Sequence, residues 1–312
     1  MIAQITEPRF AGTKIVESDA RPISERKAVV KMRLDLVLPN QGPLATESLQ
    51  AGAHFEAMGW DGLWLTDHVI GTKAYAARNP KYGSHWQEIM IAMAYVAAQT
   101  KRVRIGSGIL VLPYRDPVLV AKMIATLDSL SGGRIDMGVG TGWARREFVA
   151  LSRGDVFEDR GAYSDEMLDV MLACWKGGEI AFHGKWFDFE RITFDPTPLQ
   201  GDKVPIWVGG AGLAPAPLRR AAKYADYWHP TALSPEDVKI GGERLDEMAG
   251  RRVKRTVRFR CDKDVSEVSD LLHAYKDAGC VAVACAFDAP ETFGEFDRKA
   301  EAVLSAAKAL RD

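Results

Sequence analysis

The stretch "VRIGSGILVLPYRDPVLVAKMIATLDSLSGGRIDMGVGTG", residues 103–142, carries the clearest structural pattern in the chain. Residues 103–112 are mostly apolar, which favours a buried strand. Residues 116–133 have a helical pattern that begins near Pro117, a residue suited to a first helical turn, and ends in two glycines. Residues 134–142 are a second apolar run that ends in glycine. A strand, a helix and a strand in this order predict a parallel sheet with helices packed on it.

The same alternation continues on both sides of this stretch, with helices expected at residues 45–59 and 84–100 among others. The rhythm breaks at residues 180–200, where alternating residues flank a turn and predict a β-hairpin. Strands outside this hairpin are expected at residues 33–39, 61–68, 103–112, 134–142, 204–210, 225–230, 255–261 and 280–287. An α/β chain with this many repeats closes most naturally as a (β/α)8 TIM barrel, here with the hairpin inserted after strand 4.

A doubly wound sheet is the alternative α/β architecture. It requires a Gly-x-Gly-x-x-Gly turn after an early strand, whereas Pro39-Asn40-Gln41-Gly42 follows the first strand here. We therefore expect one barrel domain over residues 32–312, with its insertion at about 180–200. Residues 1–31 precede the regular pattern and are expected to form an N-terminal arm outside the barrel.

The composition narrows the class of protein. The formal net charge of the 312 residues is −1, which gives no reason to expect nucleic acid or an acidic membrane surface as a partner. The four cysteines form no Cys-x-x-Cys pair, so no metal site is expected, and free thiols suit a cytoplasmic location. Apolar runs are too short to span a bilayer, and the N-terminal segment, which contains Glu7, Glu17, Asp19 and Glu25 and lacks an apolar core, does not resemble a signal peptide.

Glycines follow two of the expected strands, in Gly140-Thr141-Gly142 and in Gly209-Gly210-Ala211-Gly212. The active site of such a barrel lies at the carboxyl ends of its strands. Glycines let backbone N–H groups approach an anion, and a helix expected to begin near Trp143 adds partial positive charge. The two segments therefore indicate a phosphate cradle. A tight turn that leaves Arg145 and Arg146 in solvent is the alternative.

Asp67 and His68 end the second expected strand. A carboxylate beside an imidazole can orient the ring and keep a proton on it near neutral pH. Neighbouring residues on a strand point to opposite faces, so both reach one ligand only if the strand has already ended. A surface histidine is the alternative, and His229 is the other histidine at a strand end.

Glycines also interrupt the third expected strand, at Gly106 and Gly108. Glycine inside an apolar strand is typical of a bulge or of a backbone that lies close to a ligand. Packing against a bulky neighbour is the alternative.

Six stretches together resemble the luciferase-like monooxygenase superfamily, which has the bacterial luciferase fold, and in particular its branch of oxidoreductases that use coenzyme F420, an 8-hydroxy-5-deazaflavin. They are "GLWLTDHV", "GSGILVLPYRDPVLVAKMIATLDSLSGGRIDMGVGTGWARREF", "FEDRGAYSDEMLDVMLACW", "FHGKWFDFERITFDPTPLQ", "PIWVGGAG" and "AAKYADYWHP". The resemblance runs in order from about Met32 to Pro230, and beyond Pro235 only the general pattern matches.

The resemblance implies roles for individual residues. His68, after Asp67, would be the catalytic histidine over the central ring of the cofactor. The remaining cofactor-binding residues would be Asn40 beside the ring or substrate; Gly108 and Ile109 in a bulge that often contains a cis peptide; and Gly140, Gly142, Trp143, Arg146, Gly209, Gly210, Ala211 and Gly212 around the phosphate. Sugar-phosphate dehydrogenases of the superfamily have a glutamate proton donor where this chain has Trp143, which favours a more apolar substrate.

Two reactions follow from the resemblance. The first is hydride transfer between coenzyme F420 and a small organic substrate. The alternative is a two-component monooxygenase that receives reduced FMN from a partner reductase and uses O2. A flavin-binding barrel without catalysis is a third reading, which the Asp67-His68 pair disfavours. The resemblance also implies a homodimer. The substrate pocket would take its walls from residues 72–84, the hairpin at 180–195 and the loop near residue 230.

Overall fold

The computed structural model describes residues 31–71, 77, 85–288 and 290–308. These residues belong to one compact unit, Lys31–Asp312. The predicted N-terminal arm lies outside the described residues, apart from Lys31.

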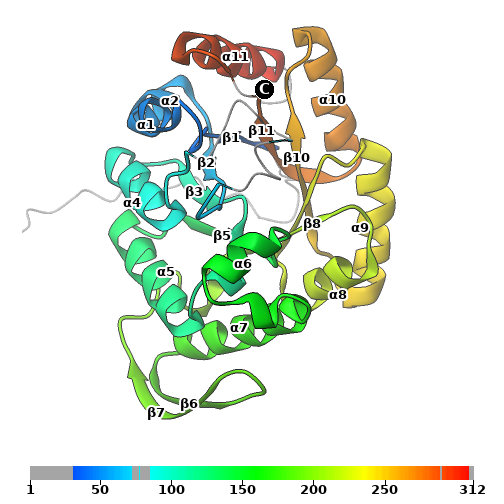
Figure 1. The fold of residues 1–312 in the computed structure, drawn as a ribbon. Coiled ribbons are helices and arrows are strands. Elements are labelled where there is room, and N and C mark those ends of the chain that lie inside the picture. The colour runs from blue at the N-terminus through cyan, green and yellow to red at the C-terminus, as the bar shows by residue number, and fades with distance from the viewer. Residues whose placement is uncertain (1–30, 72–76, 78–84, 289, 309–312) are drawn as a thin grey trace, which may run out of the picture. The chain divides into compact units, whose positions relative to one another are not determined.

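Parallel strands close into a barrel, which confirms the predicted fold (Figure 1). The strands are β1 (Arg33–Val37), β2 (Gly62–Leu65), β3 (Arg104–Ser107), β4 (Leu110–Val111), β5 (Ile135–Gly140), β8 (Ile206–Ala211), β9 (Tyr227–Thr231), β10 (Lys254–Arg260) and β11 (Cys280–Ala286). β3 and β4 are the two halves of the strand expected at 103–112, and both pair with β5 to complete the ring.

Helices surround the strands: α1 (Ala45–Gln50), α2 (Gly52–Met58), α4 (Ile89–Gln99), α5 (Pro117–Ser131), α6 (Arg145–Ala150), α7 (Arg160–Trp175), α8 (Pro215–Tyr224), α9 (Pro235–Ala249), α10 (Val265–Asp277) and α11 (Phe293–Ala306). α5 shows why its boundaries were predictable. The Asp116 carboxylate accepts hydrogen bonds from the first-turn N–H groups of Val118 and Leu119, and Gly132 ends the helix at φ 75°.

Some predicted helices differ in their bounds. The helix expected at 45–59 divides at Ala51 into α1 and α2. The helix expected at residues 84–100 is α4, which begins at Ile89, where the side chain of Glu88 caps it; residue 84 lies outside the described residues.

The predicted hairpin follows strand 4 of the barrel. β6 (Gly178–His183) and β7 (Asp188–Phe194) pair antiparallel and project away from the barrel. The Glu166 carboxylate of α7 ties the hairpin turn down, because it accepts hydrogen bonds from the backbone N–H groups of Lys185, Trp186 and Phe187 at 2.8–3.0 Å.

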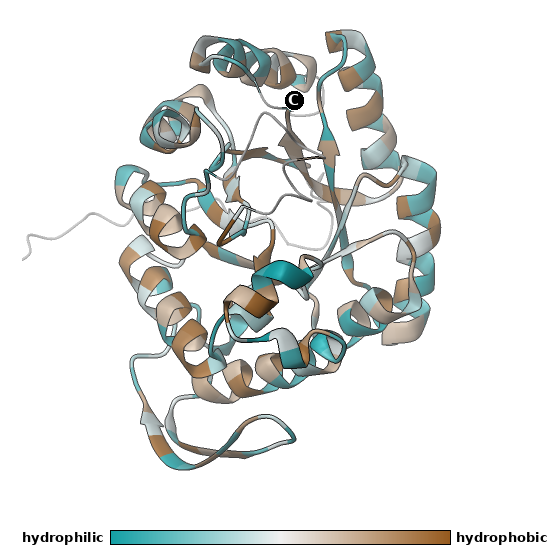
Figure 2. Cartoon of the chain, in the orientation of Figure 1, coloured by the Kyte–Doolittle hydropathy of each residue, from teal (hydrophilic) through white to brown (hydrophobic). Residues whose placement is uncertain are grey.

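Apolar residues concentrate on the strands, while the helices alternate between apolar and polar residues (Figure 2). Near the amino ends of the strands the interior is charged. Arg33 forms ion pairs with Asp35 and Asp136, each at 2.7 Å, and lies 4.8 Å from the centre of the Trp207 ring. These charges pair with one another inside the barrel, and the cavity described below lies at the opposite end, at the carboxyl termini of the strands.

Candidate active site

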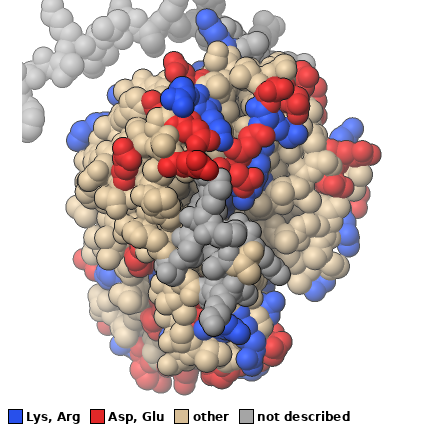
Figure 3. All heavy atoms as spheres, turned by 45° about the horizontal axis from the view of Figure 1, so that its top comes forward, with Lys and Arg blue, Asp and Glu red and all other residues tan. Residues whose placement is uncertain are grey.

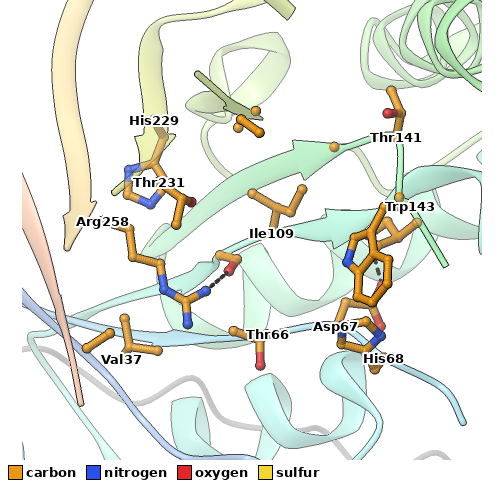
Figure 4. Close-up of a pocket in the computed structure, with 18 of the residues that line it drawn as sticks. Val37, Thr66, Asp67, His68, Ile109, Thr141, Trp143, His229, Thr231 and Arg258 are labelled. Carbon is orange, nitrogen blue, oxygen red and sulfur yellow. Dashed lines mark hydrogen bonds between the residues drawn. The ribbon is translucent and has the colours of Figure 1, made fainter. Parts of the chain in front are cut away.

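A cavity of about 480 Å³ opens at the carboxyl ends of the barrel strands. Its lining comes from strands or strand ends all round the barrel, among them β1, β2, β5, β8, β9 and β10. Figure 4 shows Ile109 near the middle, with His68 and Trp143 on one side and Arg258 and Thr231 on the other. The position agrees with the expectation for a TIM barrel.

Ile109 forms the floor of this cavity. It follows a cis peptide bond, Gly108–Ile109, as the resemblance implied. A Cβ atom on Gly140 would lie 1.8 Å from Ile109 Cδ1, and one on Gly209 would lie 2.6 Å from Ile109 Cγ2. Glycine is therefore required at both positions because the Ile109 side chain packs against them, and the result is an apolar floor.

The two glycines of the third strand have different explanations. A Cβ atom on Gly106 would lie 2.4 Å from the Trp64 ring, so close packing against a bulky neighbour accounts for it. Gly108 lies at the cavity, and its carbonyl oxygen accepts a hydrogen bond from Arg258 Nη1 at 2.9 Å.

His68 lies at one side of the cavity, and Glu147 of α6 holds it. His68 Nδ1 is 2.7 Å from Glu147 Oε2, which also accepts a 2.8 Å bond from the Tyr114 hydroxyl. The other carboxylate oxygen, Oε1, accepts hydrogen bonds from the backbone N–H groups of Val69 and Ile70. Burial pushes the pKa of Glu147 upward, but these hydrogen bonds outweigh it and the pKa is lowered.

The ionised Glu147 carboxylate can only accept hydrogen bonds, so Nδ1 of His68 must carry the proton between them. A hydrogen bond between the His68 ring and a ligand would therefore use Nε2. Burial, followed by the neighbouring Glu147 charge, raises the pKa of Tyr114, which stays a neutral donor to the same oxygen.

Asp67 has a different role from the one expected. Its carboxylate receives two bonds from Arg115, at 2.6 and 3.0 Å, and a third from the Val111 N–H at 2.9 Å. Burial raises the pKa of this carboxyl while Arg115 opposes the shift. Asp67 thus anchors the segment after β4, and the carboxylate that orients His68 is Glu147.

Aromatic rings form the wall beside His68. The Trp86 ring centre is 4.5 Å from that of His68, and the Trp143 ring centre is 5.9 Å away, with Trp143 47% exposed. The wall beside His68 is therefore aromatic, and a more apolar substrate stays a prediction.

Most of the predicted cofactor residues line the same cavity. They are Gly108, Ile109, Gly140, Gly142, Trp143, Gly209, Gly210 and Ala211, together with Asp67 and His68. This convergence of separate strand ends on one rim is the central expectation from the sequence.

Three predicted residues do not line the cavity, and the prediction that Asn40 does so is corrected. Asn40 is fully buried; its amide donates to the Thr66 carbonyl at 2.7 Å and accepts from the Thr66 N–H at 3.0 Å, so it joins β1 to β2. Arg146 is exposed on α6, a helix of six residues, and Gly212 lies just past the rim at φ 64°.

The sequence did not predict the arginines that lie on the rim of the cavity. Arg220 of α8 pairs with Asp165 at 2.5 Å, and Arg260 of β10 pairs with Asp288. Arg258, also of β10, contacts the cavity floor. These residues carry no local motif, and Glu147 offered only a weak signal, a carboxylate in the first turn of the helix after a glycine-rich strand end.

The predicted pocket walls are corrected in part. Thr231, the last residue of β9, lines the cavity near residue 230, whereas no described residue of the β6–β7 hairpin does. Residues 72–76 and 78–84 lie outside the described residues. Figure 3 shows acidic and basic side chains interspersed on the face it presents. Ion pairs such as those of Lys299 with Asp262 and Glu295 join opposite charges on the surface. Within the described residues, no helix is long and apolar enough to cross a membrane.

Comparison with known proteins adds family evidence. Residues 32–308 match the model of the family described as Luciferase-like monooxygenase. A pyrimidine monooxygenase RutA of Bradyrhizobium is 34% identical over 207 residues, which cover 61% of this chain and 54% of that protein. The chain spans about half the length of the curated relatives it matches.

Solved structures share the fold. An F420-dependent secondary alcohol dehydrogenase in complex with an F420–acetone adduct has a TM-score of 0.73 at 19% identity, covering 90% of this chain and 100% of that chain. A riboflavin lyase with modified FMN and riboflavin has a TM-score of 0.70 at 13% identity, covering 89% of this chain and 92% of that chain.

Proposed function

Since this chain belongs to the luciferase-like monooxygenase family, we propose that it is an oxidoreductase that transfers a hydride between coenzyme F420 and a small organic substrate. The choice of cofactor follows the fold neighbour that carries an F420–acetone adduct, whose match covers 90% of this chain and 100% of that chain.

The observation that carries the proposal is the pairing of the Ile109 floor with His68. Gly140 and Gly209 have no Cβ atoms and so leave room for the Ile109 side chain, which gives the cavity an apolar floor that suits a flat ring. His68 stands beside that floor and is fixed by Glu147. Glycine-rich strand ends and the buried guanidinium of Arg220 lie on the same rim and suit a phosphate.

When bound, the deazaflavin ring supplies the carbon that accepts or releases the hydride. Ile109 would support one face of the ring and leave the other to the substrate. Backbone amides of residues 140–142 and 209–211 would hold the phosphate. His68, with its Nδ1–H directed at Glu147, would take or give the substrate proton at Nε2. Trp86 and Trp143 would exclude water from that step.

A flavin-dependent monooxygenase is the second candidate. The 34% identity to RutA, a pyrimidine monooxygenase, favours it. The same floor, rim and histidine would serve reduced FMN supplied by a partner reductase, with O2 as the second substrate. The two candidates differ in cofactor, so binding separates them.

Fluorescence titration of the purified chain with F420 and with FMN is the direct test. We expect F420 to bind more tightly than FMN. Tight binding of FMN, with none of F420, would reverse the order of the candidates, and binding of neither would refute both.

Replacing the proposed catalytic residue tests its role. We expect His68→Ala to bind cofactor as the unmodified chain does and to lose turnover across a panel of alcohols and ketones. His54→Ala is the matched control, because His54 is half-exposed and pairs with Asp297 on the helical shell. Full turnover by His68→Ala would remove the proposed role.

A further inference from the structure

Gln41 is a polar residue of the cavity that the proposed function leaves without a role. It lines the cavity just past the end of β1 and is partly buried, whereas its neighbour Asn40 is fully buried. The resemblance pointed to Asn40 as the residue beside the ring or the substrate. In the structure, the residue of this pair that can reach a ligand is Gln41.

The backbone of Gln41 is held against the segment that carries Trp86. Gln41 and Trp86 form an antiparallel bridge, and the Gly42 N–H group donates to the carbonyl oxygen of His85 at 3.0 Å. The Trp86 ring centre is in turn 4.5 Å from that of His68. Gln41 is therefore fixed beside the tryptophan that contacts the proposed catalytic histidine.

One end of the Gln41 amide already has a partner. Its Oε1 atom lies 2.9 Å from the hydroxyl of Thr66, another residue of the cavity lining (Figure 4), and the same hydroxyl lies 2.9 Å from Asn40 Oδ1. A hydroxyl has one proton to donate. Since Asn40 Oδ1 already accepts the Thr66 backbone N–H at 3.0 Å, the hydroxyl proton is assigned to Gln41 Oε1. The Gln41 Nε2 group forms no hydrogen bond with another described residue, so it keeps two N–H donors for a ligand.

We propose that Gln41 binds the oxygen atom of the substrate, by donating a hydrogen bond from Nε2 to the hydroxyl of an alcohol or to the carbonyl of the matching ketone. The inference rests on the proposed function, in which the alcohol carbon gives its hydride to the cofactor ring and the hydroxyl gives its proton to His68, so that a C=O bond forms. The oxygen accepts hydrogen bonds in both forms, and one donor therefore serves substrate and product.

The position of Gln41 suits the substrate rather than the cofactor. The Ile109 side chain packs against Gly140 of β5 and Gly209 of β8. In the order of strands around the barrel, β1 lies across from β8. A ring with one face on Ile109 would therefore turn its other face, the one left to the substrate, toward the end of β1, where Gln41 stands.

Gln41→Met and Gln41→Glu test the proposal, because the first removes the donor at similar length and the second replaces it with an acceptor. With the best substrate of the alcohol and ketone panel, we expect kcat/KM to fall about tenfold in Gln41→Met, as for the loss of one hydrogen bond. The fall should be larger in Gln41→Glu, whose carboxylate repels the substrate oxygen. The affinity of both variants for F420 should change less than about threefold.

Infrared spectra give a readout of the bond itself. The best ketone of the panel, labelled with 13C at its carbonyl, is bound to the chain loaded with oxidised F420, which cannot reduce it. A hydrogen bond lowers the stretching frequency of a carbonyl, so we expect this frequency to rise in Gln41→Met. Gln87→Met is the matched control, because the Gln87 amide bonds to the Thr46 hydroxyl at 3.3 Å and does not line the cavity. It should leave the carbonyl frequency and kcat/KM unchanged.

The possible failures are distinguishable. A folded Gln41→Met variant with unchanged kcat/KM and an unchanged carbonyl frequency would overturn the proposal. A loss of F420 affinity in place of the loss of kcat/KM would also overturn it, since it would assign Gln41 to the cofactor. Full activity of Gln41→Glu would show that the ligand needs an acceptor there. If the unmodified chain turns over no member of the panel, the proposed function itself fails.

Discussion

Replacing Glu147 by glutamine should switch the tautomer of His68. The carboxylate accepts four hydrogen bonds, from His68, Tyr114, Val69 and Ile70. Glutamine has one acceptor oxygen and one donor nitrogen in the same space. If the oxygen keeps the two backbone N–H groups, which cannot turn away, the nitrogen faces Nδ1 of His68. The proton of the imidazole must then move from Nδ1 to Nε2.

The expected loss of stability follows from the same contacts. A hydrogen bond to a charged group contributes about 1.5–3 kcal/mol, and one between neutral groups about 0.5–1.5 kcal/mol. Four bonds weaken, but the cost of burying the Glu147 charge disappears and offsets part of the loss. We expect Glu147→Gln to lower the free energy of unfolding by roughly 2 kcal/mol.

Nitrogen NMR of chain labelled with 15N-histidine measures the tautomer directly, with His68→Ala to assign the signals. We expect an Nδ1–H ring in the unmodified chain and an Nε2–H ring in Glu147→Gln. Glu166→Gln is the matched control: its carboxylate also accepts three N–H groups, but in the hairpin turn, so it should lose stability and leave the His68 tautomer unchanged. An unchanged tautomer in Glu147→Gln would refute the reasoning.

Three further outcomes are expected. The folded-state pKa of His229, about 3, is below the usual value of 6.5, so the free energy of unfolding is highest above pH 6.5 and falls by about 1.4 kcal/mol per pH unit between pH 6.5 and pH 3. His229→Asn should flatten this dependence of the unfolding free energy on pH in denaturant titrations, and an unchanged dependence would contradict the prediction. Gly140→Ala should lower the free energy of unfolding by about 1–3 kcal/mol through overpacking, and Ile109→Val in the same chain should restore part of that loss, because it removes the Cδ1 atom that lies 1.8 Å from the added Cβ. Effects of the two changes that simply add would contradict this contact. The outer face of α4 is uncharged, and its Ile91 is 72% exposed. If the predicted homodimer uses this face, Ile91→Glu should halve the mass measured by light scattering, whereas a dimer that survives the change would exclude the face.

The barrel could be predicted from the sequence because its signals are local. Pro117 and Gly132 bound α5 in the chain as they do in the structure, and apolar runs mark each strand. Glycine patterns located the rim for the same reason. They did not reveal why glycine is needed, since at Gly140 and Gly209 the reason is the Ile109 side chain from another strand.

The partners of the site residues could not be predicted. β2 ends at Leu65, so strand alternation says nothing about where Asp67 and His68 point. Asp67 turns to Arg115, 48 residues away, and His68 turns to Glu147, 79 residues away. Pairings at such separations depend on barrel closure, which no local pattern encodes. The homodimer, the reductase partner and the cytoplasmic location stay predictions.

A crystal structure of the chain with F420 or FMN bound tests the central claim most directly. We expect the ring to lie on Ile109 in van der Waals contact, about 3.5–4.0 Å away, with His68 beside its central part and the phosphate between residues 140–142 and 209–211. A ring bound away from Ile109, or a phosphate at another part of the barrel, would contradict the account.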